Sequence, residues 1–315
     1  MRWNKLGRVF NPEEHQTAWM KYFSQCVSTL ILEDVVRVYF SCRPEPDEGG
    51  QISYTTFVEF DRADLFKIKH VAKQPVMPLG KRGCFDEFAI YPTSVLKEVD
   101  QIKLYYAGWY RTQSVPFNTS IGLAISEDGG LTFRRIGDGP VLAPCIDEPF
   151  VISGPKIRKF GDLYYLFYIA GKQWINHKGR QEIVYKNRLA TSKDGINWVR
   201  YGQDITPDSL ELNECQAGPD VFYKDGKYHM YFVYRYALDF RDDPERGYRI
   251  GYAHSDDLFS WTRDDANAGI TYSNEGWDSK MAHYPHVFEL DGKWFMYYNG
   301  NDFGKYGFGL AVLDE

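Results

Sequence analysis

Short runs of aromatic and aliphatic residues recur along the chain, separated by longer polar stretches. The middle of each run is aromatic, and successive middles are 66, 62, 64 and 66 residues apart. A fixed period of this length indicates a repeat architecture, in which each module folds in the same way. The five central aromatic residues are Tyr39, Tyr105, Phe167, Tyr231 and Tyr297.

Each module shows the pattern of four short strands separated by turns. The aromatic run is the second strand, and polar turns such as the one from Lys224 to Lys227 are typical of hairpins. The third strand contains alanine, and a turn with Ser and Asp leads to a fourth strand opened by an aromatic residue. The first strand carries a two-residue signal, namely Cys26-Val27, Tyr91-Pro92, Gly154-Pro155, Gly218-Pro219 and Tyr284-Pro285.

The fifth module stops after its third strand, and its missing piece is at the other end of the chain. The segment from Trp3 to Gly7 resembles the fourth strands that begin at Phe133 and Trp198. An N-terminal strand that completes the last sheet would close a ring and leave no open edge. We therefore predict an all-β fold in which residues 1–315 form a single five-bladed β-propeller domain with four-stranded antiparallel blades. An open array of repeats would not explain the displaced strand.

The composition of the chain argues against several classes of function. The formal net charge of −6 argues against nucleic acid as a partner. No apolar run reaches the roughly 20 residues that a membrane-spanning helix needs, and the first residues lack the apolar core of a secretion signal. The five cysteines are scattered, without any CxxC spacing, which favours free thiols in a reducing compartment. We expect a cytoplasmic protein without a metal or another cofactor.

The connections between second and third strands are long and irregular, whereas the other turns are short. In a propeller these long loops share one face, and long loops on a rigid scaffold are where binding residues are usually placed. The mouth of the central channel on this face is therefore the expected site. The loops run from Ser41 to Gln51, Ala107 to Ser120, Ile169 to Asn187, Val233 to Tyr248 and Asn299 to Tyr306.

Acidic residues precede the first strands of several modules. Glu87 and Glu214 each lie five residues before the proline of their module, Asp86 lies six before, and Glu148 and Asp278 lie seven before. Carboxylates that converge on one channel mouth shift each other's pKa values and can supply an acid and a base or nucleophile. The alternative is that these acids cap loops or pair with arginines.

A second group of candidates would hold the ligand. Arg43, Trp109 and Arg235 each follow the central aromatic residue by four positions, and two arginines at matching places could clamp an anion. Their alternative role is pairing with the channel acids. The full set of predicted binding residues is Arg43, Tyr91, Trp109, Arg111, Trp174, Gln216, Arg235, His283 and Asp302.

The repeats resemble those of the five-bladed propeller glycosidases, the superfamily of arabinanases and xylosidases, fructofuranosidases and mannoside phosphorylases. The most specific matches are the segments 162–168, 190–198 and 226–231. Asn213-Glu214-Cys215 is similar to the Glu-Cys motif whose Glu is the acid in fructofuranosidases. The Glu-Gly-Pro motif of the arabinanase group stands here as Ser153-Gly154-Pro155, and its Asp-Pro-Ser motif as Tyr91-Pro92-Thr93.

The resemblance implies a carbohydrate substrate and three functional alternatives. In the first, the chain is a glycoside hydrolase of a small or terminal sugar, neutral or acidic, with Glu214 as general acid, Asp86 or Glu87 as nucleophile or base, and Asp278 tuning the pair. In the second it is a phosphorylase, with phosphate held by Arg43 and Arg235. In the third it is a propeller that binds carbohydrate without catalysis.

Overall fold

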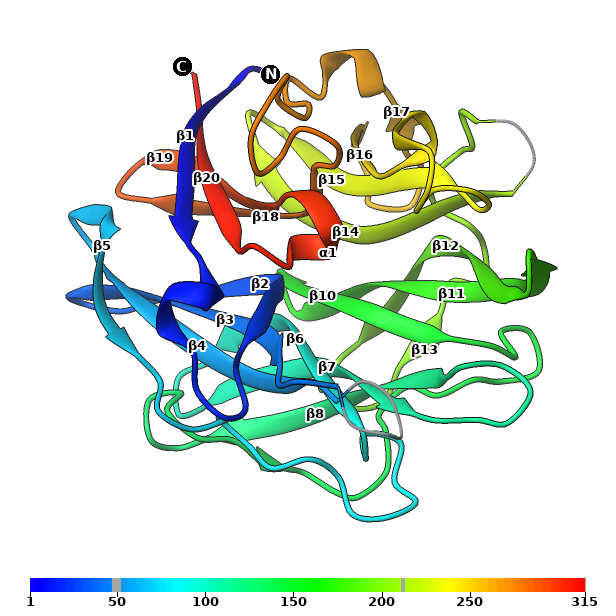
Figure 1. The fold of residues 1–315 in the computed structure, drawn as a ribbon, viewed down its shortest axis with the longest axis horizontal. Coiled ribbons are helices and arrows are strands. Elements are labelled where there is room, and N and C mark those ends of the chain that lie inside the picture. The colour runs from blue at the N-terminus through cyan, green and yellow to red at the C-terminus, as the bar shows by residue number, and fades with distance from the viewer. Residues whose placement is uncertain (47–51, 211–212, 315) are drawn as a thin grey trace.

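The computed structural model describes residues 1–46, 52–210 and 213–314. In this part of the chain, twenty strands form five four-stranded antiparallel sheets that are arranged in a ring (Figure 1). The predicted five-bladed propeller is confirmed. Of the long loops expected on one face, the segment 47–51 of the loop from Ser41 to Gln51 lies outside the described residues.

The five sheets follow the order of the chain, except for the first strand. Blade one contains β2 (Tyr22–Ile31), β3 (Val35–Arg43), β4 (Tyr54–Asp61) and β5 (Asp64–Val71). Blade two contains β6 (Ala89–Lys97), β7 (Ile102–Tyr110), β8 (Asn118–Ser126) and β9 (Arg134–Arg135). Blade three contains β10 (Ile152–Phe160), β11 (Leu163–His177), β12 (Arg180–Ser192) and β13 (Val199–Arg200).

The remaining strands form two further sheets, and four short helical turns lie in the connections. Blade four contains β14 (Glu214–Lys224), β15 (Lys227–Tyr236), β16 (Arg249–Ser255) and β17 (Thr262–Arg263). Blade five contains β18 (His283–Leu290), β19 (Lys293–Asn299), β20 (Phe308–Leu313) and β1 (Trp3–Phe10). The helical turns are η1 (Pro12–His15), η2 (Pro244–Arg246), η3 (Asp265–Asn267) and α1 (Asn301–Gly304).

The N-terminal strand closes the ring, as its sequence predicts. β1 pairs antiparallel with β20, so that Trp3 lies opposite Leu313. The Trp3 side chain is 5% exposed, and its Nε1 donates a hydrogen bond to the hydroxyl of Tyr231 at 2.7 Å. Since Tyr231 belongs to blade four, β1 both completes blade five and fixes it to its neighbour.

The inner strand of each blade carries a β-bulge at the two-residue signal seen in the sequence. The register shifts there in all five blades. A bulge re-aims the side chains that follow it, and here it sets one residue of each inner strand opposite the central aromatic residue of its blade. These five residues, which we call the channel ring, are Ser28, Ser94, Lys156, Asp220 and His286.

The channel ring ties neighbouring blades together. Four of its members accept a hydrogen bond from the backbone N–H of the next inner strand. The four bonds run from Val95 to Ser28 Oγ at 2.8 Å, from Ile157 to Ser94 Oγ at 2.9 Å, from Val287 to Asp220 Oδ2 at 2.8 Å, and from Thr29 to His286 Nε2 at 3.0 Å. Lys156 is the exception, because an ammonium group has no lone pair with which to accept.

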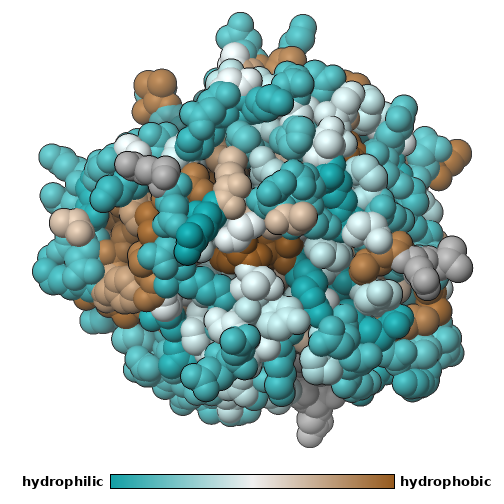
Figure 2. All heavy atoms as spheres, turned by 90° about the horizontal axis from the view of Figure 1, so that it is seen from above, coloured by the Kyte–Doolittle hydropathy of each residue, from teal (hydrophilic) through white to brown (hydrophobic). Residues whose placement is uncertain are grey.

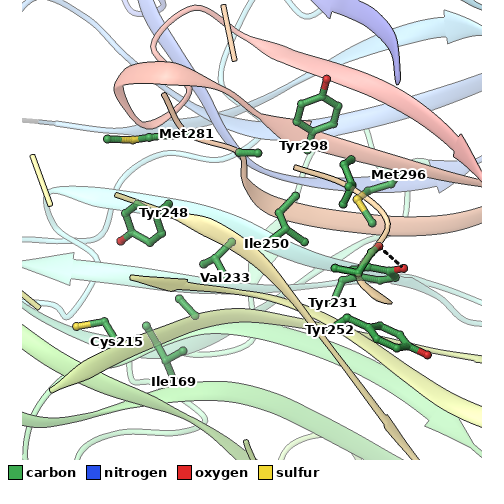
Figure 3. Close-up of a cluster of buried hydrophobic side chains, with 14 of the residues drawn as sticks. Ile169, Cys215, Tyr231, Val233, Tyr248, Ile250, Tyr252, Met281, Met296 and Tyr298 are labelled. Carbon is green, nitrogen blue, oxygen red and sulfur yellow. Dashed lines mark hydrogen bonds between the residues drawn. The ribbon is translucent and has the colours of Figure 1, made fainter. Parts of the chain in front are cut away.

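Apolar side chains fill the space between the blades. The five central aromatic residues are completely buried, which accounts for their regular spacing. The largest cluster lies among blades three, four and five, and Figure 3 shows Tyr231 and Val233 within it. The side of the molecule in Figure 2 is covered mostly by hydrophilic residues with hydrophobic ones between them. In the described residues, no helix has the length and apolar character required to cross a membrane.

Candidate active site

A cavity of about 870 Å³ opens at the ends of the inner strands and is lined by residues from all five blades. The residue that leads into each bulge reaches this cavity, because the bulge brings the backbone of the inner strand to the channel. These residues are Cys26, Tyr91, Gly154, Gly218 and Tyr284. The long loops supply the rest of the wall, so the cavity lies at the predicted face.

An aromatic wall forms one side of the cavity. The ring of Trp109 stacks on Phe117 at 4.2 Å with an interplanar angle of 7°, and Phe117 meets the edge of Trp174 at 5.5 Å. Tyr91 packs on the other side of this row, 5.3 Å from Trp109. All four rings line the cavity. Flat aromatic faces of this kind present the large apolar surface on which the C–H face of a sugar ring can pack.

A tyrosine pair and a buried arginine form part of another wall. The hydroxyls of Tyr185 and Tyr248 are 2.7 Å apart, and Nη2 of Arg235 donates to the Tyr185 hydroxyl at 3.1 Å. The guanidinium lies 3.5 Å from the centre of the Phe240 ring. Burial raises the pKa of Tyr185 well above its ordinary value, against the attraction of Arg235, so this hydroxyl stays protonated. Figure 3 shows that Tyr248 also belongs to the largest apolar cluster.

The charges that line the cavity are mainly positive. Among the described residues, Glu182 is the one carboxylate in the lining, and it faces Arg241, with Nε to Oε1 at 3.2 Å and Nη2 to Oε2 at 3.5 Å. The Glu182 side chain is 10% exposed, whereas that of Arg241 is 42% exposed. The cationic side chains in the lining are Arg43, Arg111, Lys156, Arg235 and Arg241. An anionic ligand is favoured at such a surface.

The Glu182–Arg241 pair also borders a smaller cavity of about 180 Å³. Glu182, Phe240 and Arg241 line both cavities, and they therefore form the partition between them. On the far side of the partition, His177 contacts the carboxylate of Asp239 at 2.8 Å. The carboxylate of Glu182 therefore borders a second, smaller cavity as well as the main one.

Glu214 does not line the cavity. Its carboxylate is buried and accepts hydrogen bonds from Arg263 Nη1 at 2.6 Å and from the backbone N–H of Ser209 and Leu210 at 2.9 and 2.8 Å. Burial opposes ionisation, but the hydrogen bonds from Gln216 and these backbone groups, with Arg263, hold the pKa of Glu214 below its ordinary value. The structure thus places Glu214 outside the lining of the cavity, with its bonding capacity used within blade four.

Two other predicted catalytic acids occupy the same kind of pair in their own blades. Asp86 binds Arg135 Nε at 2.6 Å, and Asp278 binds Lys5 Nζ at 2.7 Å. Glu148, which precedes the proline of its own module at a similar distance, lies 2.9 Å from Nε of Arg200. In each case the cation comes from the outer strand of the blade. The structure therefore brings these acids together with basic residues, which is the arrangement that the alternative of internal pairing expects.

The remaining predicted residues divide into two groups. Arg43, Tyr91, Trp109, Arg111, Trp174 and Arg235 line the cavity, as expected. Glu87, Gln216, His283 and Asp302 do not. Glu87 accepts from the backbone N–H of Gly83 at 2.8 Å, Gln216 donates to Glu214, His283 contacts the Gly300 carbonyl at 2.8 Å, and Asp302 is exposed in α1. Each of the four therefore has a local partner or lies at the surface, away from the lining of the cavity.

Several cavity residues escape prediction from sequence. Glu182 lies on the third strand of its blade, near the tip of a hairpin much longer than the others, and only the pairing of β11 with β12 brings it over the cavity. Lys156 could have been found, because it directly follows the proline of its module, where Asp220 and His286 stand in theirs. In the described residues no three His, Cys, Asp or Glu side chains gather as a metal site requires.

Comparison with known proteins gives relatives of the sequence and of the fold. The uncharacterized protein Rv1502 of Mycobacterium tuberculosis is 34% identical over 315 residues, which is the full length of both chains. A β-1,2-mannobiose phosphorylase of a Thermoanaerobacter species is 26% identical over 126 residues, covering 36% of this chain and 41% of that one. No family model matches the sequence.

Solved structures agree on the fold. A glycoside hydrolase matches with a TM-score of 0.76 and 18% identity, covering 99% of this chain and 92% of the other. A structure from the family of mannoside phosphorylases that contains glycoside hydrolases acting on β-1,2-mannosidic linkages matches with a TM-score of 0.66 and 15% identity, over 99% and 93% of the two chains. The likeness is one of architecture, because the identities are low.

Proposed function

This chain belongs to the same family as the uncharacterized protein Rv1502 of Mycobacterium tuberculosis and has the five-bladed fold of glycoside hydrolases and mannoside phosphorylases, and we propose that it is a glycoside phosphorylase. It would cleave a small saccharide bound in the main cavity, with inorganic phosphate as the attacking group. The observation that carries the proposal is the charge of the lining, which combines several cations with the carboxylate of Glu182.

Hydrolysis of a glycoside usually takes two carboxyl groups on either side of the scissile bond. They stand about 5 Å apart in retaining enzymes and roughly 6.5–9.5 Å apart in inverting ones. Among the described residues that line the cavity, Glu182 has no second carboxylate to work with. Phosphate supplies its own nucleophilic oxygen, so that one protein acid and a set of cations are sufficient. The partial match to a mannobiose phosphorylase supports the same choice.

The proposed step uses Glu182 as general acid. A phosphate oxygen attacks the anomeric carbon, the bond from that carbon to the glycosidic oxygen breaks, and the carboxyl proton of Glu182 passes to the departing oxygen. The products are a glycosyl phosphate and a saccharide shortened by one unit. The rings of Trp109 and Phe117 would hold the sugar, while cavity arginines hold the phosphate.

Arg241 would change partners when phosphate binds. In the free protein its guanidinium faces the carboxylate of Glu182. Because the Arg241 side chain is partly exposed, it can turn to a bound phosphate. The carboxyl group of Glu182 would then be free to act on the glycosidic oxygen when the nucleophile is in place.

The test is cleavage with and without phosphate. The protein is incubated with β-1,2-mannobiose and a panel of aryl glycosides, and glycosyl phosphate is followed by phosphorus NMR. We expect product only with phosphate, and a fall in turnover of about 10²–10⁴-fold in Glu182→Gln. The control is Glu289→Gln, which alters an exposed glutamate of β18 outside the cavity. Phosphate-independent release of sugar would establish a hydrolase instead, and saccharide binding without any cleavage would establish a binding propeller.

A further inference from the structure

Lys156 stands at the floor of the main cavity and breaks the pattern of the channel ring. The other four members accept a hydrogen bond from the next blade, whereas Lys156 does not. Its Nζ donates instead to the carbonyl oxygen of Val27 at 3.2 Å, across the channel. Positions that depart from an otherwise shared structural pattern, and give up a bond to do so, are expected at functional sites.

The charges around Lys156 do not balance. Asp220 is the acidic member of the ring, and both of its oxygens are occupied: Arg158 binds Oδ1, while His286 and the backbone of Val287 bind Oδ2. The negative charge of Asp220 is therefore balanced by the positive charge of Arg158. Lys156 adds a second positive charge, and the buried residues of the channel ring hold no second carboxylate as its counter-ion.

His286 cannot supply the missing acceptor. Its Nε2 accepts from the backbone N–H of Thr29, which leaves the ring proton on Nδ1, where it is donated to Asp220 at 3.0 Å. Burial, with the nearby Lys156, lowers the pKa of His286 to about 4, so the ring is neutral at pH 7. The contact of 3.3 Å between Nζ of Lys156 and Nδ1 of His286 therefore joins two donors.

Lys156 is thus a buried cation that faces a cavity. Its residue is 4% exposed, and it forms no salt bridge with a carboxylate of the described residues. Burial lowers the pKa of Lys156, against the attraction of Asp220. Buried charges in proteins are paired almost without exception, because an unpaired one is costly. The cavity beside Lys156 is the remaining place for a partner.

We propose that Lys156 is the specificity residue for an anionic group on the terminal sugar, so that the substrate is a saccharide that ends in a uronic acid or a phosphorylated unit. The inference rests on the proposed function in taking the cavity as the saccharide site. A carboxylate or phosphate monoester at the floor would receive charge-assisted hydrogen bonds from Nζ and neutralise the buried excess charge. Inorganic phosphate would be held separately by cavity arginines.

Binding measurements test this assignment without any cleavage. Calorimetric titrations compare hexuronates and hexose phosphates with their neutral parent hexoses, and inorganic phosphate alone, for the wild type, Lys156→Met and Lys103→Met. Lys103 is a matched control, because it is a buried lysine that pairs with Glu98 at 3.5 Å outside the cavity. We expect at least one charged sugar to bind tenfold or more tightly than its parent, and this preference to vanish in Lys156→Met only.

A second readout separates recognition from a structural role. Because Lys156→Met removes an uncompensated buried charge and keeps the volume of the side chain, its Tm without ligand should rise above that of the wild type. A lower Tm, or an equal loss of affinity for charged and neutral sugars, would show that Lys156 serves the fold. The proposal also fails if no charged sugar is preferred, or if Lys156→Met loses affinity for inorganic phosphate alone. Since these are binding data, they stand apart from the cleavage assay of Glu182→Gln.

Discussion

Glu214→Gln distinguishes a structural acid from a catalytic one. The substitution keeps the shape of the side chain but removes the charge that faces Arg263. It also turns an amide NH₂ toward donors, because Oε1 of the carboxylate accepts from Arg263 and Gln216. The backbone N–H groups of Ser209 and Leu210 both bind Oε2 and can keep the amide oxygen as their acceptor. The donors that face the NH₂ lose their acceptor, and a buried donor without a partner costs about 1–3 kcal/mol.

The expected loss of stability follows from these contacts. Breaking a buried ion pair by removing one partner costs about 3–5 kcal/mol. Arg263 retains Asp265, 2.8 Å from its Nε, and this second carboxylate reduces the penalty. We therefore expect Glu214→Gln to lower the free energy of unfolding by about 2–4 kcal/mol, and the Tm by about 4–8 °C. Below that Tm, turnover should remain within a few-fold of the wild type.

The assay compares Glu214→Gln with Glu148→Gln. Glu148 is the equivalent acid of blade three, where it binds Arg200 at 2.9 Å and the hydroxyl of Tyr168 at 2.9 Å. Thermal unfolding and turnover are measured for both variants at a temperature at which both are folded. If the two acids share a structural role, the variants lose similar stability and keep turnover.

The pH dependence provides an independent check of the same contact. The pKa of Glu214 is lowered in the fold from its ordinary 4.5, so its contribution to stability is complete above pH 4.5 and is lost as the pH falls further. The Tm difference between the wild type and Glu214→Gln should therefore shrink below pH 4.5. A fall in turnover of 10²-fold or more in Glu214→Gln alone, with stability unchanged, would refute this reasoning and restore Glu214 as the general acid.

Two further predictions concern ring closure and acid stability. Trp3→Ala should lower the free energy of unfolding by about 3–5 kcal/mol, because it removes a buried ring and its hydrogen bond to Tyr231 between blades four and five. A midpoint of urea unfolding equal to that of the wild type would contradict the role of β1 in closing the ring. Stability should also fall as the pH drops from about 6.5 toward 4, since burial lowers the pKa values of His283 and His286 to about 4 and the unfolded chain takes up protons first in this interval. A Tm that stays constant between pH 7 and 5 would rule out this account.

The fold could be predicted from the sequence because its determinants are repeated. The central aromatic residues, the bulge signals and the displaced segment at Trp3 each have several copies to compare, and all mark burial or backbone geometry. Because burial and backbone geometry are required in every blade, the residues that meet these requirements recur along the sequence with a fixed period. The residues that line the cavity from the bulges, such as Tyr91, follow from the same register.

The sequence does not reveal the partners of the candidate acids, for a physical reason. Asp86, Glu214 and Asp278 precede the prolines of their inner strands at similar distances, which the sequence shows, but the basic partners come from outer strands. Those strands are two residues long in blades two and four. A motif of two residues carries too little pattern to reveal Arg135 and Arg263 as partners, so the acids appeared free for catalysis.

In this fold, a contact that recurs at matching positions of several blades has a structural role, whereas a position that differs in one blade is a candidate for function. The acid–base pairs recur from blade to blade, and a feature that recurs cannot create one active site within a ring of five. Glu182 has no such counterpart, because it depends on the extended hairpin of β11 and β12, and Lys156 alone departs from the accepting role shared by the channel ring. Both residues line the same cavity. Glu182 supplies the carboxylate of its lining, and Lys156 is a buried cation without a counter-ion. The proposed chemistry on an anionic saccharide would use both, and each only once.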